Sequence, residues 1–400
     1  MKAVVYHGVG DIRLDEVPEP MIQQPTDAIV RLTASAICGT DLHFVRGTMP
    51  GTKEGRILGH EGVGVVEQVG DFVRNLKVGD RVVIPSTIAC GTCSYCRSGY
   101  YAQCDNANPN GPGTAFFGGP EDAGGFDGLQ AELARVPYAN VGLVKIPEGV
   151  SDDQAILISD IFPTGYMAAD IAEIRPGDVV VVLGCGPVGQ FTIWSAKHLG
   201  AGRVIAVDGT PDRLERAREQ GAEIVDFGHD DAVPLIKEMT RGIGPDRVID
   251  AVGVDANRPP GDGAASFERE RDAIAPERVE AGRQWQAGSG PTQAVRWAVE
   301  IVAKAGTICL IGVYPPTVAS FPIGQAFMKN LTLTMGNCNH RKYVPGLVEL
   351  VRTGVVDPTK LISQQQPLES AVEAYAAFDR RDEGWLKVAL QPVTAGAGGA

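Results

Sequence analysis

The 400-residue sequence contains no apolar run of the roughly 18 residues that a membrane-spanning helix requires. It also lacks an excess of positive charge: 36 Lys and Arg against 49 Asp and Glu give a net charge of −13, which repels nucleic acids and acidic membranes. There is no internal repeat, and because residues 1–6 lead straight into a strand-like pattern, we expect no signal peptide. We therefore expect a cytoplasmic protein whose partners are a small-molecule substrate and copies of itself, in a homo-oligomer (dimer or tetramer), with no nucleic acid and no membrane.

The length and a hydrophobic fraction of 44% fit a globular α/β protein of about two domains. Up to about residue 153, short β-rich runs such as 28–32, 63–69 and 81–84 are separated by Gly, Pro and Asp, which predicts a barrel-like β domain. From about residue 178 an apolar strand (179–183), a helical stretch (188–199) and a second strand (203–207) follow one another. This order predicts a βαβ unit in a parallel sheet.

One segment interrupts the alternation of helices and strands. Residues 254–291 contain two adjacent prolines, several glycines and a dense run of charges, and they are too long for a routine connection. We interpret the segment as an insertion, either functional or mobile. The small residues at 394–400 are expected to fray.

Four of the eight cysteines fall within fifteen residues, in the spacing C-x-x-C-x-x-C with a fourth eight residues on. Without a signal peptide this cluster favours a metal over disulfides. Four thiolates complete the tetrahedral coordination of zinc and leave no open position, which is typical of a structural site. The alternative is a chance cluster of reduced thiols. The predicted structural zinc ligands are Cys90, Cys93, Cys96 and Cys104.

A second group of polar residues is dispersed over two short segments. His60 and Glu61 lie in a Gly-His-Glu sequence, where a neutral imidazole can bind zinc and a carboxylate can act from behind it. Upstream, the segment 38–43 (C-G-T-D-L-H) gathers a thiolate, a hydroxyl, a carboxylate and an imidazole. Each histidine taken alone is more often an ordinary core or surface residue than a ligand.

A glycine-rich turn follows the apolar strand 179–183 and opens the helix. Glycines there allow a tight turn, close approach of the backbone to a pyrophosphate and close packing of helix on strand, while the helix N-terminus carries a partial positive charge. The strand before and the helix after give this motif the context that a dinucleotide-binding site requires. The predicted cofactor-binding residues of the turn are Gly184, Gly186, Pro187, Val188 and Gly189.

Asp208 ends the second strand at about the spacing expected of a carboxylate that binds the ribose hydroxyls of the cofactor. A carboxylate there repels a 2′-phosphate, which favours NAD over NADP. Arg213, five residues on, could instead reach such a phosphate, so NADP stays an alternative. Asp208 could also do no more than cap the turn.

Together these segments resemble the zinc-dependent alcohol dehydrogenases of the medium-chain dehydrogenase/reductase superfamily, over nearly the whole chain and in the family's order. The resemblance implies a GroES-like β-rich catalytic domain and a doubly wound Rossmann cofactor domain. The expected limits are 1–161 for the catalytic domain, with a zinc lobe at 86–108, then 162–335 for the NAD-binding domain, and 336–400 for a return to the catalytic domain.

The resemblance also implies a catalytic zinc with three protein ligands and an open position, so that the chain would hold two zinc ions and NAD. Cys38 and His60 match two of the ligands. No Cys lies between Cys104 and Cys185, and Asp160 stands where the third ligand is usual. The segment around Asp160 looks like that of the glutathione-independent formaldehyde dehydrogenases, and the insertion at 254–291 points the same way.

Further roles carry over by position. Thr40 would bond the alcohol oxygen and begin a proton relay to His43, Asp41 would hold the ring of His60, and Glu61 would lie behind the zinc. Thr164 would pack against the nicotinamide, and the backbone near Val313 would meet its carboxamide. Because Gly39 replaces the basic residue that some members use for the pyrophosphate, Lys387 is the expected substitute.

The predicted activity is hydride transfer between a small alcohol or an aldehyde hydrate, of the formaldehyde type, and NAD, with zinc lowering the pKa of the bound alcohol. A polyol, sugar or amino-alcohol dehydrogenase with the same zinc and cofactor is the alternative within this class. A non-catalytic NAD-binding protein of the same fold would need no zinc relay, and the joint presence of Cys38, Thr40, His43, His60 and Asp160 argues against it.

Overall fold

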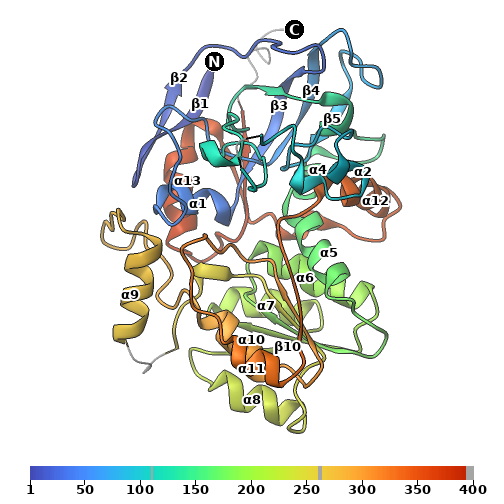
Figure 1. The fold of residues 1–400 in the computed structure, drawn as a ribbon. Helices are drawn as coiled ribbons and strands as arrows, with labels where there is room; N and C mark the ends of the chain where they lie inside the picture. Colours follow the sequence, from blue (N-terminus) through green and yellow to red (C-terminus); the bar gives the residue numbers. More distant parts are fainter. Residues whose placement is uncertain (110, 260–263, 393–400) are drawn as a thin grey trace. The chain divides into compact units, whose positions relative to one another are not determined.

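The computed structural model describes residues 1–109, 111–259 and 264–392. The chain divides into two compact units. Unit 1 comprises Met1–Pro163, Arg278–Gln286 and the described residues from Cys338 onward, and unit 2 comprises the described residues of Thr164–Glu277 and Ala287–Asn337 (Figure 1). The outer limits lie two residues from those expected, whereas the assignment of Arg278–Gln286 to unit 1 was not foreseen. The expected fraying at 394–400 concerns residues outside the described ranges.

Unit 1 is built on a seven-stranded sheet in the order β14-β15-β3-β4-β5-β7, with β6 paired to β3. Strand β3 is longer than the expected 28–32 because Ser35–Ile37 pair with the C-terminal strand β15, a partner remote in sequence. A separate hairpin, β1-β2, completes its strands. The bounds are β1 Lys2–Gly8, β2 Asp11–Glu16, β3 Ala28–Ile37, β4 Gly62–Val69, β5 Arg81–Ile84, β6 Leu133–Val136, β7 Val144–Lys145, β14 Gln364–Pro367 and β15 Val388–Gln391.

The longest described helix of unit 1 is α12, with 13 residues, and the others have nine residues or fewer. The helices are α1 Gly39–Val45, α2 Ser94–Arg97, α3 Ala139–Gly142, α4 Asp152–Ile158, α12 His340–Arg352 and α13 Ala371–Asp379, with 3-10 turns η1 Tyr101–Gln103, η2 Glu121–Ala123, η4 Pro358–Leu361 and η5 Leu368–Ser370. Alternate residues of β3 (Ala28, Val30, Leu32) pack into a core with the cysteine lobe, while Ile37 packs into a second core with α1 and α13. Strand β3 thus contributes side chains to two packed cores of unit 1.

Unit 2 holds a fully parallel six-stranded sheet in the order β10-β9-β8-β11-β12-β13. This is the doubly wound order, in which the third, second and first strands are followed by the fourth, fifth and sixth. The Rossmann fold expected for this part is confirmed. Its strands are β8 Val179–Leu183, β9 Arg203–Asp208, β10 Glu223–Asp226, β11 Arg247–Asp250, β12 Thr307–Leu310 and β13 Thr332–Met335.

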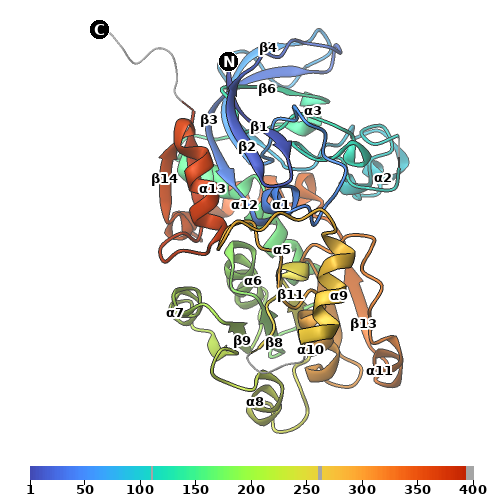
Figure 2. The ribbon, with the colours of Figure 1, turned by 90° about the vertical axis from the view of Figure 1, so that its left-hand side faces the viewer.

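Helices cover both faces of this sheet. Val181 and Leu183 of β8 pack in one core with α8 and α10, whereas Val180 and Val182 pack in another with α5, α6 and α7. Figure 2 shows α6 and α7 on one side of the strands and α10 on the other. The continuous apolar run of β8 follows from burial on both faces. The helices are α5 Ile161–Ile171, α6 Pro187–His198, α7 Pro211–Glu219, α8 Ala232–Met239, α9 Ala264–Ile274, α10 Gln293–Ile301 and α11 Ile323–Met328, with the 3-10 turn η3 Gly253–Asp255.

The insertion predicted at 254–291 carries one helix, α9, and its positions 260–263 lie outside the described residues. Val254, Ile274, Ala275 and Ala287 form a small core of their own in unit 2. In contrast, Trp285 is buried in the core of unit 1 beside α1 and α13. The described part of the insertion thus packs into cores of both units, and Arg278–Gln286 belongs to the β-rich unit. None of the described helices is both long and apolar enough to span a bilayer.

Candidate active site

Three of the predicted ligands of a catalytic zinc converge in unit 1. Cys38 follows β3, His60 precedes β4 and Asp160 lies between α4 and α5. The Cys38 thiol sulfur is 3.5 Å from Oδ2 of Asp160, and Nε2 of His60 is 3.4 Å from the same oxygen. Their ligand atoms and one carboxylate oxygen of Glu61 all lie within 4.8 Å of one another, and all four residues are buried. A sulfur, a nitrogen and an oxygen donor at one point are a set that fits zinc.

Asp41 ties two of these ligands together. One of its oxygens, Oδ1, is 3.0 Å from Nδ1 of His60, and the other accepts a hydrogen bond from the backbone N–H of Cys38 at 2.9 Å. Because Asp41 lies in the first turn of α1, directly after Cys38, the short C-G-T-D segment suffices to place its carboxylate. The contact with Nδ1 turns Nε2 of His60 toward Cys38 and Asp160, as expected of a carboxylate that orients a ligating histidine.

Glu61 lies beside these ligands and is paired with Lys387. Oε2 of Glu61 is 2.5 Å from the Lys387 ammonium, which also donates to the carbonyl of Ile37 at 3.0 Å. Oε1 of Glu61 is buried without a hydrogen-bond partner among the described residues. The predicted contact of Lys387 with a pyrophosphate is therefore corrected: the side chain is 1% exposed and its charge is compensated inside unit 1.

Burial, neighbouring charges and hydrogen bonds together shift the pKa values of these groups. Burial raises the pKa of Cys38, and the Asp160 charge adds to that rise. Burial alone would lower the pKa of His60, but the charges of Asp41 and Cys38 outweigh it and raise the pKa well above its usual range. For Glu61, burial raises the pKa to about 7 although Lys387 opposes the rise. Burial also favours a raised pKa at Asp160, yet the hydrogen bonds from His340 and His60 hold that pKa well below the ordinary value.

The two residues of the predicted proton relay both lie on α1. Thr40 is half-buried in its first turn, and His43 is buried one turn later. Nδ1 of His43 is 2.7 Å from the hydroxyl oxygen of Thr48, which fixes the plane of the ring. Their roles toward a substrate stay predictions.

The four clustered cysteines also come together. The ligand atoms of Cys90, Cys93, Cys96 and Cys104 lie within 4.8 Å of one another. Backbone N–H groups point at the sulfurs: those of Thr92 and Cys93 donate to the Cys90 sulfur, both at 3.3 Å, and that of Cys90 donates to the Cys104 sulfur at 3.2 Å. Although burial raises the pKa of Cys90, the hydrogen bond from the Thr92 hydroxyl at 3.4 Å and those from the backbone of Thr92 and Cys93 bring this pKa down to about 6, which favours a thiolate. The donor set fits a closed zinc site.

In unit 2 the glycine-rich turn has the backbone that the sequence requires. Gly184 has a φ of +91°, a conformation that other residues rarely adopt. A Cβ at Gly189 would lie 1.9 Å from the carbonyl oxygen of Gly184, so only glycine allows the helix to begin so close to the strand. Gly186 caps α6 and Pro187 occupies its first turn, followed by Val188. The positive end of α6 thus faces the turn in which a pyrophosphate is expected.

Asp208 at the end of β9 holds this turn in place. Its Oδ2 accepts from the backbone N–H of Cys185 at 2.7 Å, and its Oδ1 accepts from Gly209 and Thr210 at 2.8 and 2.9 Å. The structure thus gives Asp208 the capping role that the sequence left open, and its contact with a ribose stays a prediction. Arg213 on α7 reaches the turn, since a Cβ at Gly186 would lie 3.7 Å from its Nη1.

Two predicted nicotinamide contacts lie elsewhere in unit 2. Thr164 is on α5, and Val313 follows β12. The carbonyl of Val313 accepts a hydrogen bond from Val254 at 3.0 Å, which ties the end of β12 to the start of the insertion. Both contacts with the cofactor remain predictions.

The sequence did not reveal three further residues of the unit 1 site. Nε2 of His340 lies 2.8 Å from Oδ1 of Asp160. Gln130 donates to the carbonyl of Ala36 at 3.0 Å and accepts from the Tyr375 hydroxyl at 2.7 Å, close to Asp41. These residues are 89 or more positions from the groups that they support, and no local motif links them.

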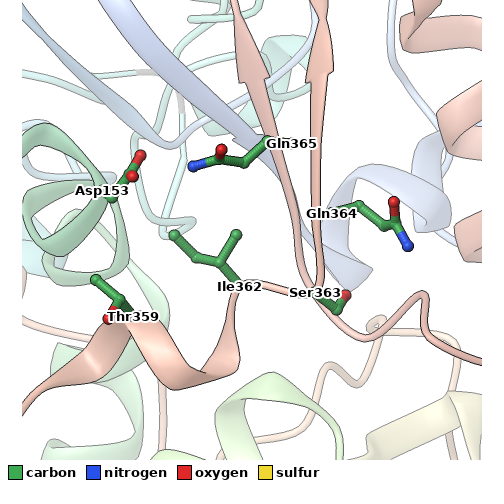
Figure 3. A pocket seen from close by; sticks show the side chains of 6 residues that line it. All are labelled: Asp153, Thr359, Ile362, Ser363, Gln364 and Gln365. Atoms are coloured by element: carbon green, nitrogen blue, oxygen red, sulfur yellow. The ribbon is translucent and has the colours of Figure 1, made fainter.

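A separate polar pocket of about 340 Å³ lies between α4 and β14 in unit 1. None of its lining residues is a predicted site residue, so we assign it no part in the chemistry. Figure 3 shows the side chains that line it, Asp153, Thr359, Ile362, Ser363, Gln364 and Gln365.

A β-rich unit with two zinc-type donor clusters, joined to a doubly wound unit with a dinucleotide-type turn, defines a zinc-type dehydrogenase. Comparison with family models agrees: residues 24–148 match the alcohol dehydrogenase GroES-like domain, and residues 187–259 match the zinc-binding dehydrogenase domain. The expected GroES-like domain is thereby confirmed.

Known relatives extend over almost the whole chain. An uncharacterized zinc-type alcohol dehydrogenase-like protein of Bacillus subtilis, AdhB, is 40% identical over 396 residues, which is 98% of this chain and 100% of that protein. The solved alcohol dehydrogenase TADH of Thermus sp. ATN1 is 36% identical, with a TM-score of 0.80 over 98% of this chain and 100% of its own. The glutathione-independent formaldehyde dehydrogenase of Pseudomonas aeruginosa is 38% identical over 287 residues, covering 68% of this chain and 69% of that one. The chain belongs to the zinc-type medium-chain alcohol dehydrogenase family and is an oxidoreductase.

Proposed function

We propose that this protein oxidises small alcohols, or the hydrates of small aldehydes such as formaldehyde, with NAD and without glutathione. The observation that carries this proposal is the buried convergence of Cys38, His60 and Asp160. An aspartate as the third donor matches the glutathione-independent formaldehyde dehydrogenases, which the segment around Asp160 resembles. The likeness to the Pseudomonas formaldehyde dehydrogenase and the insertion at 254–291 support the same branch.

Cys38, His60 and Asp160 would hold one zinc ion, and Cys90, Cys93, Cys96 and Cys104 would hold another. Zinc at the first site supplies Lewis-acid catalysis, and NAD supplies the hydride acceptor. The four-cysteine site has no open position and orders its lobe without taking part in the chemistry.

The side chains of unit 1 perform the remaining tasks. Asp41 keeps the His60 ring in the tautomer whose Nε2 can ligate. Thr40 is proposed to accept the proton of the substrate hydroxyl into a relay that ends at His43. Since Thr48 fixes Nδ1 of His43, the relay is assigned to Nε2. Lys387 compensates the charge of Glu61, which keeps a second carboxylate tolerable beside Asp160.

In unit 2, the turn at 184–189 and the start of α6 would bind the pyrophosphate through backbone N–H groups. Asp208 is proposed to accept from the ribose hydroxyls while it holds the turn, and Thr164 and the backbone at Val313 are proposed to border the nicotinamide. Arg213 stays the residue that would admit NADP.

The test is a steady-state screen of formaldehyde, small alcohols and polyols with NAD or NADP, with and without glutathione, together with a zinc assay. We expect two zinc ions per chain and NAD-dependent turnover of formaldehyde or small alcohols without glutathione. Activity confined to polyols would favour the alternative, and activity that requires glutathione would overturn the proposed branch.

A matched pair of variants tests the site itself. Asp160→Ala should abolish turnover and remove one zinc ion while NAD binding persists. Asp153→Ala, the same change seven positions away in the polar pocket, should leave both zinc ions and turnover in place. If Asp160→Ala kept normal turnover, the ligand assignment would be wrong.

A further inference from the structure

Asp160 has a second buried partner besides the two ligands. Nε2 of His340, the first residue of α12, lies 2.8 Å from Oδ1 of Asp160. The two residues are 2% and 8% exposed and 180 positions apart in the sequence. Nothing in the predicted catalytic machinery requires a histidine at this place.

The proton positions follow from the geometry. A carboxylate only accepts hydrogen bonds, so Nε2 of His340 must carry the proton that joins it to Oδ1. On the other side of the ring, Nδ1 is 3.1 Å from the hydroxyl oxygen of Thr87, which is itself 3.3 Å from the carbonyl of Cys338. The imidazole is therefore held at both nitrogens, and its direction toward Asp160 is fixed.

The two oxygens of Asp160 consequently differ. Oδ1 is engaged by His340, whereas Oδ2 is the oxygen that faces the Cys38 sulfur and Nε2 of His60. A carboxylate without such a partner can rotate and can bind a metal through one oxygen or two. A thiolate has a single ligand atom and no such choice.

Resting on the proposed function, we propose that His340 is a positioning residue that makes Asp160 a one-oxygen zinc ligand. By holding Oδ1, it directs Oδ2 at the metal and keeps the fourth position open for substrate. The hydrogen bond thus lets the two-oxygen carboxylate of Asp160 act as a ligand with a single donor atom, as a thiolate does.

The test compares two amide variants, His340→Gln and His340→Asn. The amide nitrogen of Gln reaches about as far as Nε2 of His and can donate to Oδ1, whereas that of Asn, one methylene shorter, cannot. Loss of a group that orients a metal ligand costs about 10- to 100-fold in metal affinity or activity. We expect His340→Asn to release the catalytic zinc to a chelator about 10- to 100-fold faster than the wild-type protein and to have a lower kcat. His340→Gln should keep most of the wild-type zinc retention and most of the wild-type kcat.

Cobalt(II) substitution gives a readout that does not depend on turnover. The visible absorption of cobalt in the catalytic site should change in His340→Asn, because the carboxylate can then bind through both oxygens, and should keep its wild-type form in His340→Gln. Equal chelation rates and equal spectra in the two variants would overturn the proposal. Thr87→Val, which releases the far side of the ring, should give an intermediate chelation rate and serves as the second variant if His340→Asn fails to fold.

The Asp160→Cys background separates this proposal from the proposed function. In that background the third ligand is a thiolate with one donor atom, so adding His340→Asn should change the rate of zinc release less than twofold. A change as large as the one that His340→Asn causes beside Asp160 would contradict the positioning role of His340. If the wild-type protein bound only the four-cysteine zinc, the proposed function would fail. If it bound two and His340→Asn released zinc at the wild-type rate, only the role of His340 would fail.

Discussion

At the scale of single residues, Asp208 and Arg213 bring opposite charges to the same glycine-rich turn. Asp208 accepts three backbone hydrogen bonds there, and Arg213 lies beside Gly186. Even in bulk water, two like unit charges about 4 Å apart repel by about 1 kcal/mol, or roughly fivefold in binding. Because the carboxylate is fixed by the turn, whereas the arginine is a longer side chain, we expect the repulsion by Asp208 to outweigh the attraction by Arg213.

We therefore expect kcat/KM to be at least about fivefold higher with NAD than with NADP. Arg213→Ala should lower kcat/KM for NADP further and change that for NAD less. Arg218→Ala, an exposed change on the same helix, is the control and should affect neither cofactor. Equal use of both cofactors by the wild-type protein would contradict the role proposed for Asp208.

At the scale of elements, the cysteine lobe depends on its metal because it contains little regular structure. Between Cys90 and Cys104 the structure has only α2, of four residues, and η1, of three. Structural zinc contributes about 10–16 kcal/mol in small zinc-finger peptides at pH 7. The lobe packs on the core of β3 and β5, so its loss should be felt through much of unit 1.

Cys90→Ser should reduce zinc from two ions per chain to one and lower the melting temperature. A loss of about 3 kcal/mol corresponds to roughly 3–4 °C in a 400-residue protein, since the unfolding entropy is about 2.1 cal/mol/K per residue. Cys309→Ala is the matched control, because burial raises the pKa of this β12 thiol to about 12 and keeps it neutral. Metal analysis and calorimetry check both variants, and a Cys90→Ser protein with an unchanged melting temperature would contradict the structural role.

The elements that the sequence revealed are those with local signals. The apolar run of β8, the glycine turn and α6 are continuous in sequence, and so is the C-G-T-D segment that places Asp41 against His60. The contacts of His340 with Asp160 and of Lys387 with Glu61 join positions 180 and 326 apart, and they are set by packing rather than by any periodic pattern. Lys387 was assigned to a phosphate from its position in the sequence alone, but its ammonium group lies against the carboxylate of Glu61.

The contacts that fix Trp285 were not evident from the sequence either. Asp379, at the end of α13, accepts from the backbone N–H of Trp285 at 2.6 Å and from Nε of Arg46 at 2.7 Å. The ion pair is almost fully buried, with side chains 3% and 1% exposed. Trp285 has a φ of +58°, so its backbone conformation depends on this fixation.

Asp379→Ala is expected to destabilise unit 1 by about 3–5 kcal/mol, because it removes one partner of a buried ion pair. Asp382→Ala provides the comparison: its surface pair with Arg380 is worth about 0–1 kcal/mol. Urea unfolding followed by tryptophan fluorescence measures both. If the two variants unfolded at the same urea concentration, the Arg46–Asp379 pair would contribute no more than a surface pair.

At the scale of the whole molecule, the parallel sheet of unit 2 has two edges of different character. Strand β10 forms one edge, and it begins and ends with acidic residues, Glu223 and Asp226. Strand β13 forms the other and reads Thr-Leu-Thr-Met, without a charge. Next to it in sequence, α11 exposes Phe327 and Met328 by 78% and 79%. An uncharged edge strand beside exposed apolar side chains favours pairing with another chain.

We expect two copies of this chain to associate through β13 and α11, because a two-fold axis at the edge would pair the two strands antiparallel and cover the apolar side chains. Phe327→Glu combined with Met328→Glu should then lower the mass measured by light scattering to that of a smaller assembly. Ile243→Glu, which changes a residue that is 71% exposed outside this edge, should leave the mass unchanged. Because the catalytic donors lie in unit 1, the charge-reversed protein should keep both zinc ions, so a lost assembly with full zinc content would separate association from folding. An unchanged mass in the double variant would place any self-association on another surface.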